Sequence, residues 1–505
     1  MKIALYSHSI PPAVDGVSRR MASLLQELTK QGHEILLFTL EKSPQLEAAG
    51  SPSAAPAYIT LDSTFIKVYP SKRLAKPTLS NVMLIADTLR REKPDVLHAT
   101  VDCISAFFIL AAKFLRVPVV GSVHTDVQEL LAEMHVAPLM GALVSFKEGV
   151  ESRLLDTCAT TSPSFKEKLA GRGVLCDHIL KTGVKVAQFT PTARNAEVRN
   201  RLTFGNPEGL LVVYVGRFGP EKRLDKLIRM CGSVDGVYLA LIGDGALGHT
   251  LSQRHGSWSN RSNGSNGSIE TRRTQGGVYC RAGFLGHEDL APVYASADVH
   301  VSCSQFETLG NTVLEAHACG TTVVVPRAQG FVDTVHHGED GFLFDGTRLA
   351  EGAELLACLR DDRVLCDKMG ERGRIKVQMQ SPEMVSRDVL AWYRRGRARA
   401  QAIKKSPATS NRTRTWAAAA AAWVRDVRDT LRSLGSVVMG IGICLFILAV
   451  VASWFAVEAV QGFAGSFARH CHNARNVLGN SSFFNKISNS YKALTNIPVE
   501  REAAR

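Results

Sequence analysis

Two glutamates stand eight positions apart in the segment Phe306–Glu315, which reads FETLGNTVLE. An apolar strand is expected at Val299–Ser302, and a helix after Gly310 would carry Glu315 about two turns along its length. The N-terminus of such a helix presents free backbone N–H groups and a partial positive charge to a phosphate. The segment therefore predicts a site where a phosphate-bearing sugar meets backbone donors and both carboxylates, those of Glu307 and Glu315. An exposed glutamate followed by an ordinary helical one is the alternative that the spacing alone leaves open.

Two cations, Arg217 and Lys222, follow an apolar strand expected at Leu210–Val215. A guanidinium binds phosphate oxygens through paired hydrogen bonds and an ammonium acts as a point charge, so the two could hold a diphosphate together. A solvated charge pair on a loop is the alternative. Gly243 and Asp244 end the next expected strand, where they form either a tight turn beside a ligand or an ordinary turn.

The N-terminal half contributes two further candidates, Gly16 and His124. Gly16 opens a helix after the first expected strand and would let the backbone approach a ligand closely, although the full Gly-x-Gly-x-x-Gly fingerprint is missing. His124 follows a strand expected at Val119–Val123, and ligands of open α/β sheets bind beyond the carboxyl ends of strands. Each also has a structural alternative: an ordinary turn beside two solvated arginines, Arg19 and Arg20, and a histidine that only packs.

These side chains need a scaffold in which short apolar strands alternate with amphipathic helices. Such a βα rhythm indicates a parallel sheet covered on both faces. It occurs twice along the chain, on either side of a polar stretch near residues 191–207. The predicted strands are Lys2–Ser7, Glu34–Leu40, Ile66–Tyr69, Val96–His98 and Val119–Val123, and then Leu210–Val215, Tyr238–Ile242, Val278–Tyr279, Val299–Ser302 and Thr322–Val325.

The composition bounds the class of protein. A chain of 505 residues exceeds what one core usually supports. Its 11 cysteines form no Cys-x-x-Cys pair and no zinc-type spacing with histidine, which favours a reducing compartment and a metal-free fold.

The net charge of +13 is concentrated in one segment, since twelve Lys and Arg stand against three Asp and Glu between Arg387 and Arg432. Basic residues do not alternate with aromatic ones, so nucleic-acid binding is not expected. The first residues form a strand and not a secretory signal, so a cytosolic start is expected.

Four motifs together carry a family resemblance: Val215–Lys222 (VGRFGPEK), Gly243–Gly245, Tyr294–Val299 (YASADV) and the Glu307/Glu315 pair. In these the chain resembles a retaining glycosyltransferase of the GT-B fold, and more narrowly the family 4 transferases with their Glu-x7-Glu signature. The similarity spans roughly residues 2–393. Within that family, the chain is similar to the plant and cyanobacterial sulfolipid synthases, the sulfoquinovosyltransferases. The similarity lies in the opening strand and loop, in His124-Thr125 and in the sequence of residues 304–310.

The resemblance implies a role for each candidate residue. Cationic Arg217 and Lys222 would bind the donor diphosphate and stabilise it as it departs, since placed cations are the largest catalytic contribution expected for such a transfer. Glu307 would bind sugar hydroxyls, His124 would contact the sugar near its 6-position, and Glu315 would bind the ribose. The backbone of Leu309, Gly310 and Asn311 would bind phosphate. Gly16 would contact the donor through its loop, and Gly243 and Asp244 would form a turn beside the ligand. No cofactor and no metal are implied, because the two cations can do the work of Mg²⁺.

Two departures from the family pattern bear on the donor. Asp15 precedes Gly16 where many relatives have two glycines, and Asp126 stands where the sulfolipid enzymes typically have a second histidine. Both put the sulfonated donor in question more than the reaction class.

Beyond the enzyme-like region, residues 433–457 form an uncharged apolar run, with Arg425, Arg428 and Arg432 before it and Glu458 after it. Its length suits a transmembrane helix, and the flanking charges predict a single-pass membrane protein with its catalytic part on the cytosolic or stromal side. A buried core helix is the alternative. The predicted organisation is an N-terminal acceptor-side Rossmann-like domain (1–187), a nucleotide-sugar-binding Rossmann-like domain (188–381), a returning helix (382–400), a basic linker (401–432), the transmembrane helix (433–457) and a tail (458–505).

The expected function is transfer of sulfoquinovose from its UDP conjugate to diacylglycerol at a membrane. A mannosyl- or glucosyltransferase acting on an inositol lipid or diacylglycerol is one alternative. An inactive GT-B module that serves as a membrane scaffold is another, although intact Arg217, Lys222, Glu307 and Glu315 argue against it.

Overall fold

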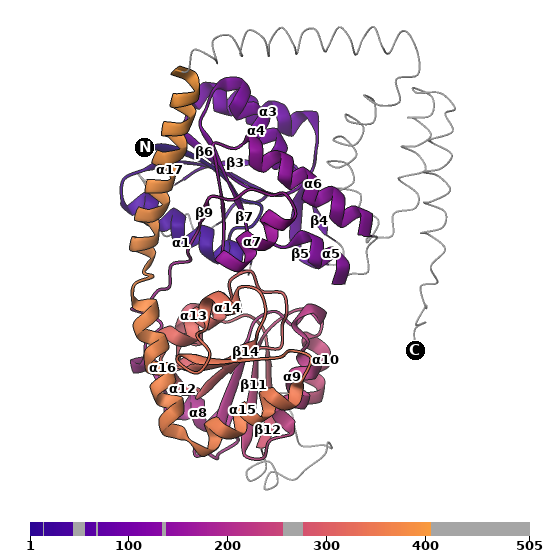
Figure 1. Ribbon diagram of the computed structural model, residues 1–505, viewed down its shortest axis with the longest axis vertical. Helices are drawn as coiled ribbons and strands as arrows, with labels where there is room; N and C mark the ends of the chain where they lie inside the picture. Colours follow the sequence, from indigo (N-terminus) through magenta and orange to yellow (C-terminus); the bar gives the residue numbers. More distant parts are fainter. Residues whose placement is uncertain (14, 44–55, 67–68, 134–137, 256–275, 406–505) are drawn as a thin grey trace, which may run out of the picture.

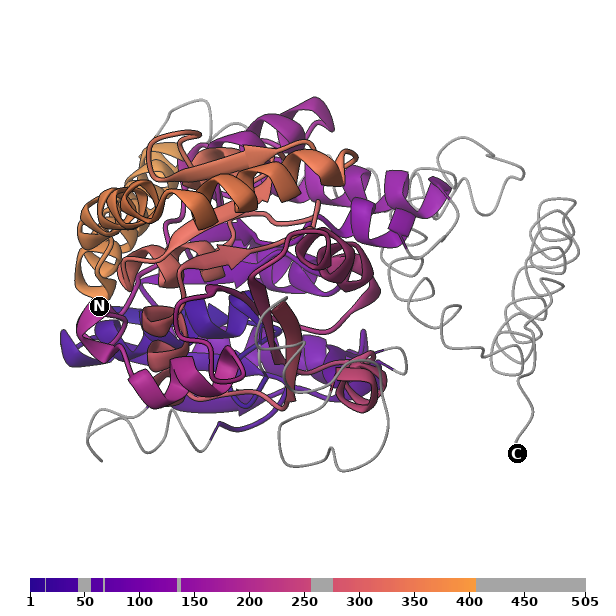
Figure 2. The ribbon, with the colours of Figure 1, turned by 90° about the horizontal axis from the view of Figure 1, so that it is seen from below.

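The computed structural model describes residues 1–405 except 14, 44–55, 67–68, 134–137 and 256–275. Figure 1 shows two α/β units, one above the other, with helix α16 (Arg363–Gln378) beside the second unit and α17 (Pro382–Lys405) along the first. Helices lie on both sides of the strands in each unit (Figures 1 and 2). The predicted α/β class with two Rossmann-like units is thereby confirmed.

The first sheet has seven strands in the order β3-β2-β1-β6-β7-β8-β9, all parallel. The order reverses at its centre, because β1 lies between β2 and β6. The strands are β1 (Lys2–Tyr6), β2 (Glu34–Thr39), β3 (Ala57–Thr60), β6 (Val96–Thr100), β7 (Val119–Val123), β8 (Thr157–Thr160) and β9 (His178–Ile179), and the helices are α1 (Gly16–Lys30), α3 (Leu79–Glu92), α4 (Ser105–Leu115), α5 (Val127–Glu133), α6 (Pro138–Leu154) and α7 (Pro163–Gly171).

The second sheet has six parallel strands in the order β12-β11-β10-β13-β14-β15, with its reversal between β10 and β13. Ligands bind at such switch points, beyond the carboxyl ends of the strands. The strands are β10 (Leu210–Val215), β11 (Val237–Gly243), β12 (Gly276–Ala282), β13 (Val299–Val301), β14 (Thr322–Pro326) and β15 (Gly341–Phe344), and the helices are η1 (Pro191–Ala193), α8 (Ala196–Leu202), η2 (Pro220–Lys222), α9 (Leu224–Gly232), α10 (Gly248–His255), α12 (His287–Ser296), α13 (Asn311–Ala318), α14 (Phe331–Thr334) and α15 (Leu349–Asp361).

Apolar layers cover both faces of each sheet, which is why central strands such as β1 and β10 are apolar along almost their whole length. In the first unit one layer includes Tyr6 stacked on Phe108 at 4.3 Å between ring centroids. The other layer holds Trp392 and Tyr393 of α17, both fully buried. The Trp392 indole N–H donates to Thr157 Oγ1 over 2.9 Å, so α17 follows the second unit in sequence but packs against the first sheet. The domain limits proposed from the sequence stay predictions.

One predicted strand is wrong. Ile66 and Tyr69, the described ends of the segment predicted at 66–69, do not join the parallel sheet; Ser63–Ile66 (β4) and Tyr69–Ala75 (β5) pair antiparallel in a separate two-stranded sheet. The edge of the parallel sheet is β3 instead, whose side chains are mostly half-exposed or exposed. An edge strand need not be apolar on both faces, and hydrophobic runs alone therefore selected the wrong segment.

The predicted transmembrane helix requires a correction. No helix among the described residues is both long and apolar enough to cross a bilayer. The longest of them, α17, carries seven Lys and Arg within 24 residues. The structure therefore does not support the transmembrane part of the predicted fold, nor the single-pass localisation derived from it. Residues 433–457, the linker from 406 onward and the tail lie outside the described residues.

Candidate active site

A cavity of about 350 Å³ is lined by residues of both units. Most of its lining residues lie at the start of α1 and in the loops that follow β7, β10, β11, β12, β13 and β14, that is, beyond the carboxyl ends of strands in both sheets. Of the residues predicted from the sequence, it brings together Gly16, His124, Arg217, Lys222, Gly243, Glu307, Leu309, Gly310 and Asn311.

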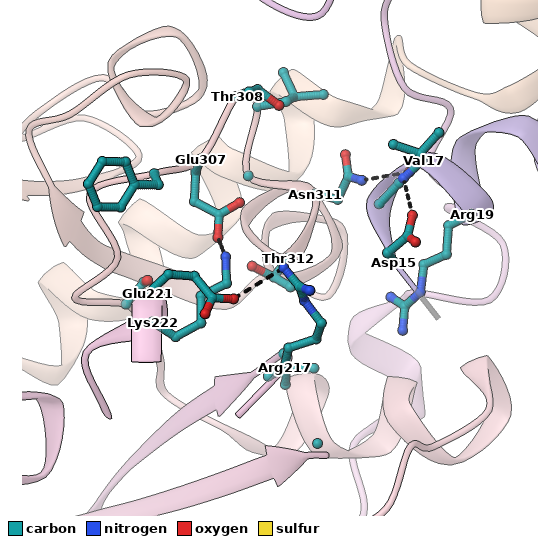
Figure 3. Close-up of a pocket in the computed structure, with 18 of the residues that line it drawn as sticks. Asp15, Val17, Arg19, Arg217, Glu221, Lys222, Glu307, Thr308, Asn311 and Thr312 are labelled. Carbon is teal, nitrogen blue, oxygen red and sulfur yellow. Dashed lines mark hydrogen bonds and ion pairs between the residues drawn. The ribbon is translucent and has the colours of Figure 1, made fainter. Parts of the chain in front are cut away.

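The wall contributed by the second unit, here called the C-wall, contains two cations that are each paired with a carboxylate. Lys222 Nζ contacts Glu307 Oε1, and Arg217 Nη2 lies 3.1 Å from Glu221 Oε1 (Figure 3). The turn of η2 presents Lys222, while Tyr214 Oη donates to the Arg217 carbonyl over 2.7 Å and fixes the backbone there. The C-wall therefore offers two cations whose present partners an incoming diphosphate could replace.

Glycines let the loops of the C-wall come together. Gly243 has φ +148°, and a Cβ there would lie 1.8 Å from the carbonyl oxygen of Gly216, so a side chain cannot be accommodated. Gly310 has φ +81° and is the residue before α13. Its left-handed conformation, which glycine adopts readily, turns the chain so that Leu309, Gly310 and Asn311 line the cavity.

Two predicted residues do not line the cavity. The buried carboxylate of Glu315 accepts hydrogen bonds from Arg19 Nη1 at 2.8 Å and from Tyr294 Oη at 3.1 Å. Asp244 Oδ1 accepts the backbone N–H of Gly245 at 2.8 Å and thus stabilises its own turn. The structure therefore gives Glu315 an ion pair between the two units and Asp244 a local structural contact.

The wall contributed by the first unit, here called the N-wall, begins at the N-terminus of α1. Asp15 caps this helix by accepting hydrogen bonds from the N–H groups of Val17 and Ser18, both at 2.9 Å. A Cβ on Gly16 would lie 2.9 Å from Asn311 Nδ2 (Figure 3 shows Asn311 beside this turn). A side chain at this position would have to displace the Asn311 amide, so glycine suits the close approach of the second unit.

His124 lies in the N-wall with both ring nitrogens already in contact with protein groups. Arg20 Nη1 is 2.7 Å from Nδ1, and Ser122 Oγ is 2.8 Å from Nε2. A guanidinium only donates, so Nδ1 accepts, Nε2 carries the proton, and Ser122 in turn donates to His98 Nε2 at 2.7 Å. Burial and the charge of Arg20 hold the pKa of His124 well below its usual value. His124 is therefore a neutral imidazole held in one tautomer.

The sequence interpretation assigned no ligand role to three residues that the structure places at the cavity. Arg19 and Arg20 were considered only as solvated arginines, yet the side chain of Arg19 pairs with Glu315 and Arg20 is 6% exposed. Glu221, the partner of Arg217, is also buried. The available signal was a pair of adjacent arginines three and four residues after Gly16, in the helix that follows the first strand.

Within the described part of the chain, no group of three or more His, Cys, Asp or Glu side chains could hold a metal ion. Whether transfer proceeds without a metal stays a prediction.

The fold and the site together define a two-domain α/β protein with a cavity between its units and two cations, Arg217 and Lys222, on one wall. Residues 14–188 match the model for glycosyltransferase family 4, and residues 200–376 match the model for glycosyl transferases group 1. The chain belongs to these GT-B glycosyltransferases, and it transfers a sugar from a nucleotide-sugar donor. The predicted family resemblance is confirmed.

Individual relatives narrow the comparison. Over 383 residues the chain is 29% identical to sulfoquinovosyl transferase SQD2 of Arabidopsis thaliana. The aligned region covers 74% of this chain and 69% of the relative. The chain is 27% identical over 348 residues to a GDP-mannose-dependent alpha-mannosyltransferase of Corynebacterium glutamicum, covering 68% and 77%. The crystal structure of Anabaena Alr3699/HepE in complex with UDP and glucose superposes with a TM-score of 0.58 at 16% identity, covering 77% and 98%, and shows the shared fold.

Proposed function

We propose that this protein is a retaining glycosyltransferase that moves sulfoquinovose from UDP-sulfoquinovose to diacylglycerol. The observation that carries the proposal is the convergence of Arg217, Lys222 and Glu307 on one cavity that the first unit closes from the other side. The similarity to a sulfoquinovosyl transferase supports the choice of donor and acceptor. Retention of configuration is inferred from the family resemblance.

In the proposed reaction the donor diphosphate lies against Arg217 and Lys222 and replaces Glu221 and Glu307 as their partner. The bond between the anomeric carbon and the β-phosphate oxygen breaks, while the glycerol hydroxyl oxygen bonds to that carbon and passes its proton to the departing diphosphate. Negative charge grows on the diphosphate as the bond breaks, so both cations stabilise the transition state more than the bound donor. Once released from Lys222, Glu307 can accept hydrogen bonds from sugar hydroxyls.

A second candidate is mannosyl transfer from GDP-mannose to an inositol lipid or diacylglycerol. Two observations favour it: the similarity to a GDP-mannose-dependent alpha-mannosyltransferase, and Asp126 in the position where sulfolipid synthases typically have histidine. In the structure Asp126 is held by Arg172 at 2.6 Å and Lys168 at 3.0 Å.

The test is a donor panel. Purified full-length protein is incubated with diacylglycerol in detergent micelles and with UDP-sulfoquinovose, UDP-glucose or GDP-mannose. Release of nucleoside diphosphate and the mass of the glycolipid are measured, and NMR gives the anomeric configuration of the product. Sulfoquinovosyl-diacylglycerol with the donor's configuration is expected. Turnover with GDP-mannose or UDP-glucose alone would refute the proposed donor, and a folded protein without turnover on any donor would favour an inactive scaffold.

A further inference from the structure

Arg20 is a buried cation at the edge of the cavity. Its Nε donates to Thr182 Oγ1 over 2.7 Å and its Nη1 to His124 Nδ1 over 2.7 Å. Among the described residues, none accepts a hydrogen bond from Nη2 and no carboxylate pairs with the guanidinium. Burial lowers the pKa of Arg20 to about 10, so the side chain stays charged at neutral pH. A buried charge without a counter-charge is strongly unfavourable unless a ligand supplies one.

The other three cations among the described cavity-lining residues differ from Arg20. Arg19 pairs with Glu315, Lys222 with Glu307, and Arg217 with Glu221. Nor do the acids of the N-wall compensate Arg20. Asp15 caps α1 and accepts from Ser9 Oγ at 2.6 Å, while Asp126 is bound to Lys168 and Arg172. Arg20 is thus the cavity cation whose charge the described part of the chain leaves uncompensated.

We propose that Arg20 is a specificity-determining residue, which binds an acidic group of the transferred sugar through Nη2. Two contacts hold the guanidinium in a fixed plane, and a planar fork suits the oxygens of a sulfonate or carboxylate. Arg217 and Lys222 belong to the opposite wall and would serve the diphosphate, so the anion at Arg20 is a second one on the same substrate.

This inference rests on the proposed function. Diacylglycerol carries no charge, and UDP-sulfoquinovose has one acidic group besides its diphosphate, the sulfonate. A sulfonate stays ionised at any physiological pH and needs a donor that is permanently charged. Arg20 meets that need better than His124, because burial and the positive charge of Arg20 lower the pKa of His124 and keep its imidazole neutral. A phosphate on an acceptor is the other possible source of an anion, and the test separates the two.

The test measures kcat/KM with UDP-sulfoquinovose and with UDP-glucose for the wild type, Arg20→Met and Arg20→Lys. Methionine keeps much of the side-chain volume without the charge, and lysine keeps the charge without the fork. The ratio of the two kcat/KM values removes any general damage caused by displacing His124. Arg20→Met is expected to lower the ratio of kcat/KM for UDP-sulfoquinovose to kcat/KM for UDP-glucose by roughly 10- to 100-fold. This is the effect of one hydrogen bond to a charged group. For Arg20→Lys the expected loss is smaller.

Lys30→Met is the matched control, because Lys30 lies in the last turn of the same helix with its side chain 70% exposed. It should keep the wild-type ratio, and thermal melting checks that each variant folds. If Arg20→Met does not fold, Arg20→Lys decides by its ratio.

The outcomes separate the two proposals. A wild type that prefers UDP-sulfoquinovose, with the same preference in both Arg20 variants, would overturn the role of Arg20 and leave the proposed function standing. A wild type without that preference would refute the proposed donor and this inference with it. If Arg20→Met instead raised the KM of a phosphate-bearing acceptor alone, the acidic group would belong to the acceptor and the assignment to the sugar would be wrong.

Discussion

The C-wall and the N-wall of the cavity solve the problem of a buried charge in opposite ways. In the C-wall each cation has a carboxylate partner, Lys222 with Glu307 and Arg217 with Glu221. In the N-wall the buried cation Arg20 contacts a neutral histidine and a threonine. Among the described residues, carboxylates balance both cations of the C-wall before a ligand arrives, whereas none balances Arg20 in the N-wall.

The difference indicates when each wall acts. A diphosphate must displace glutamates from the C-wall, so part of its attraction to Arg217 and Lys222 is offset in the bound donor. As charge builds up on the leaving group the cations are already free to stabilise it, which favours the transition state. The N-wall needs no rearrangement and is suited to recognising a charge that does not change during the reaction.

Lys222→Ala gives the largest expected effect and tests the C-wall. Removing one partner of the developing charge should lower kcat by at least about a hundredfold. Initial rates over a range of donor concentrations separate kcat from KM. Arg229→Ala is the control, since Arg229 carries the same charge on the nearby helix α9 but its side chain is 68% exposed and pairs with Asp225.

A rise in KM with kcat preserved would contradict this role for Lys222, and would leave the C-wall as a binding surface only. The double variant Lys222→Ala/Glu307→Gln sharpens the comparison. It removes the carboxylate that Lys222→Ala leaves unpaired, so any KM increase caused by repulsion between Glu307 and the diphosphate should disappear in it.

Arg19→Met tests the contact between the walls. Arg19 in α1 binds Glu315 in α13, so the ion pair holds the two units around the cavity. Its loss should shift the protein toward an open arrangement and raise the KM for the donor by roughly fivefold, as expected for a partly exposed pair worth about 1 kcal/mol. Lys2→Met is the control, because Lys2 pairs with Glu34 and Glu92 inside the first unit. A lower KM would show instead that Arg19 competes with the donor for Glu315.

The sequence predicted the strands at the centres of both sheets because those strands are apolar on both faces, as in β1 (Lys2–Tyr6) and β10 (Leu210–Val215). It missed β3, β9 and β15, which lie at the edges of the two sheets, and also β8 (Thr157–Thr160), a buried strand in which two of the four residues are threonine. The motif identified Arg217, Lys222 and Glu307, since each lies in the connection between a strand and the next α-helix.

Contacts between the units could not be read from one segment at a time. Glu315 was expected beside a ligand, but the side chain that meets it comes from Arg19, nearly three hundred positions away in sequence. The same holds for Arg20, whose burial depends on His124 and Thr182. A local pattern gives the type of a residue and its element, but not which distant side chains pack against it.

The smallest expected effect concerns the layer behind the N-wall, where Ser122 links His124 to His98 and His98 Nδ1 lies 2.8 Å from Tyr393 Oη. Burial lowers the pKa of His98 to about 3, against about 6.5 in an unfolded chain. Below pH 6.5 the unfolded state therefore binds a proton that the native state does not. The free energy of unfolding should fall with decreasing pH, by about 1.4 kcal/mol per pH unit for this one histidine, until about pH 3.

Urea titrations at pH 5 and pH 6 measure that slope. His98→Gln should reduce it by about 1.4 kcal/mol per pH unit, because glutamine takes up no proton in either state. The matched control Tyr393→Phe removes the hydroxyl that His98 contacts and leaves the imidazole buried, so its slope should equal that of the wild type. An unchanged slope in His98→Gln would mean that His98 is protonated in the native protein. A protonated His98 would then place a second positive charge close to Arg20. The contrast with the C-wall requires the opposite, namely that the histidines near Arg20 are neutral.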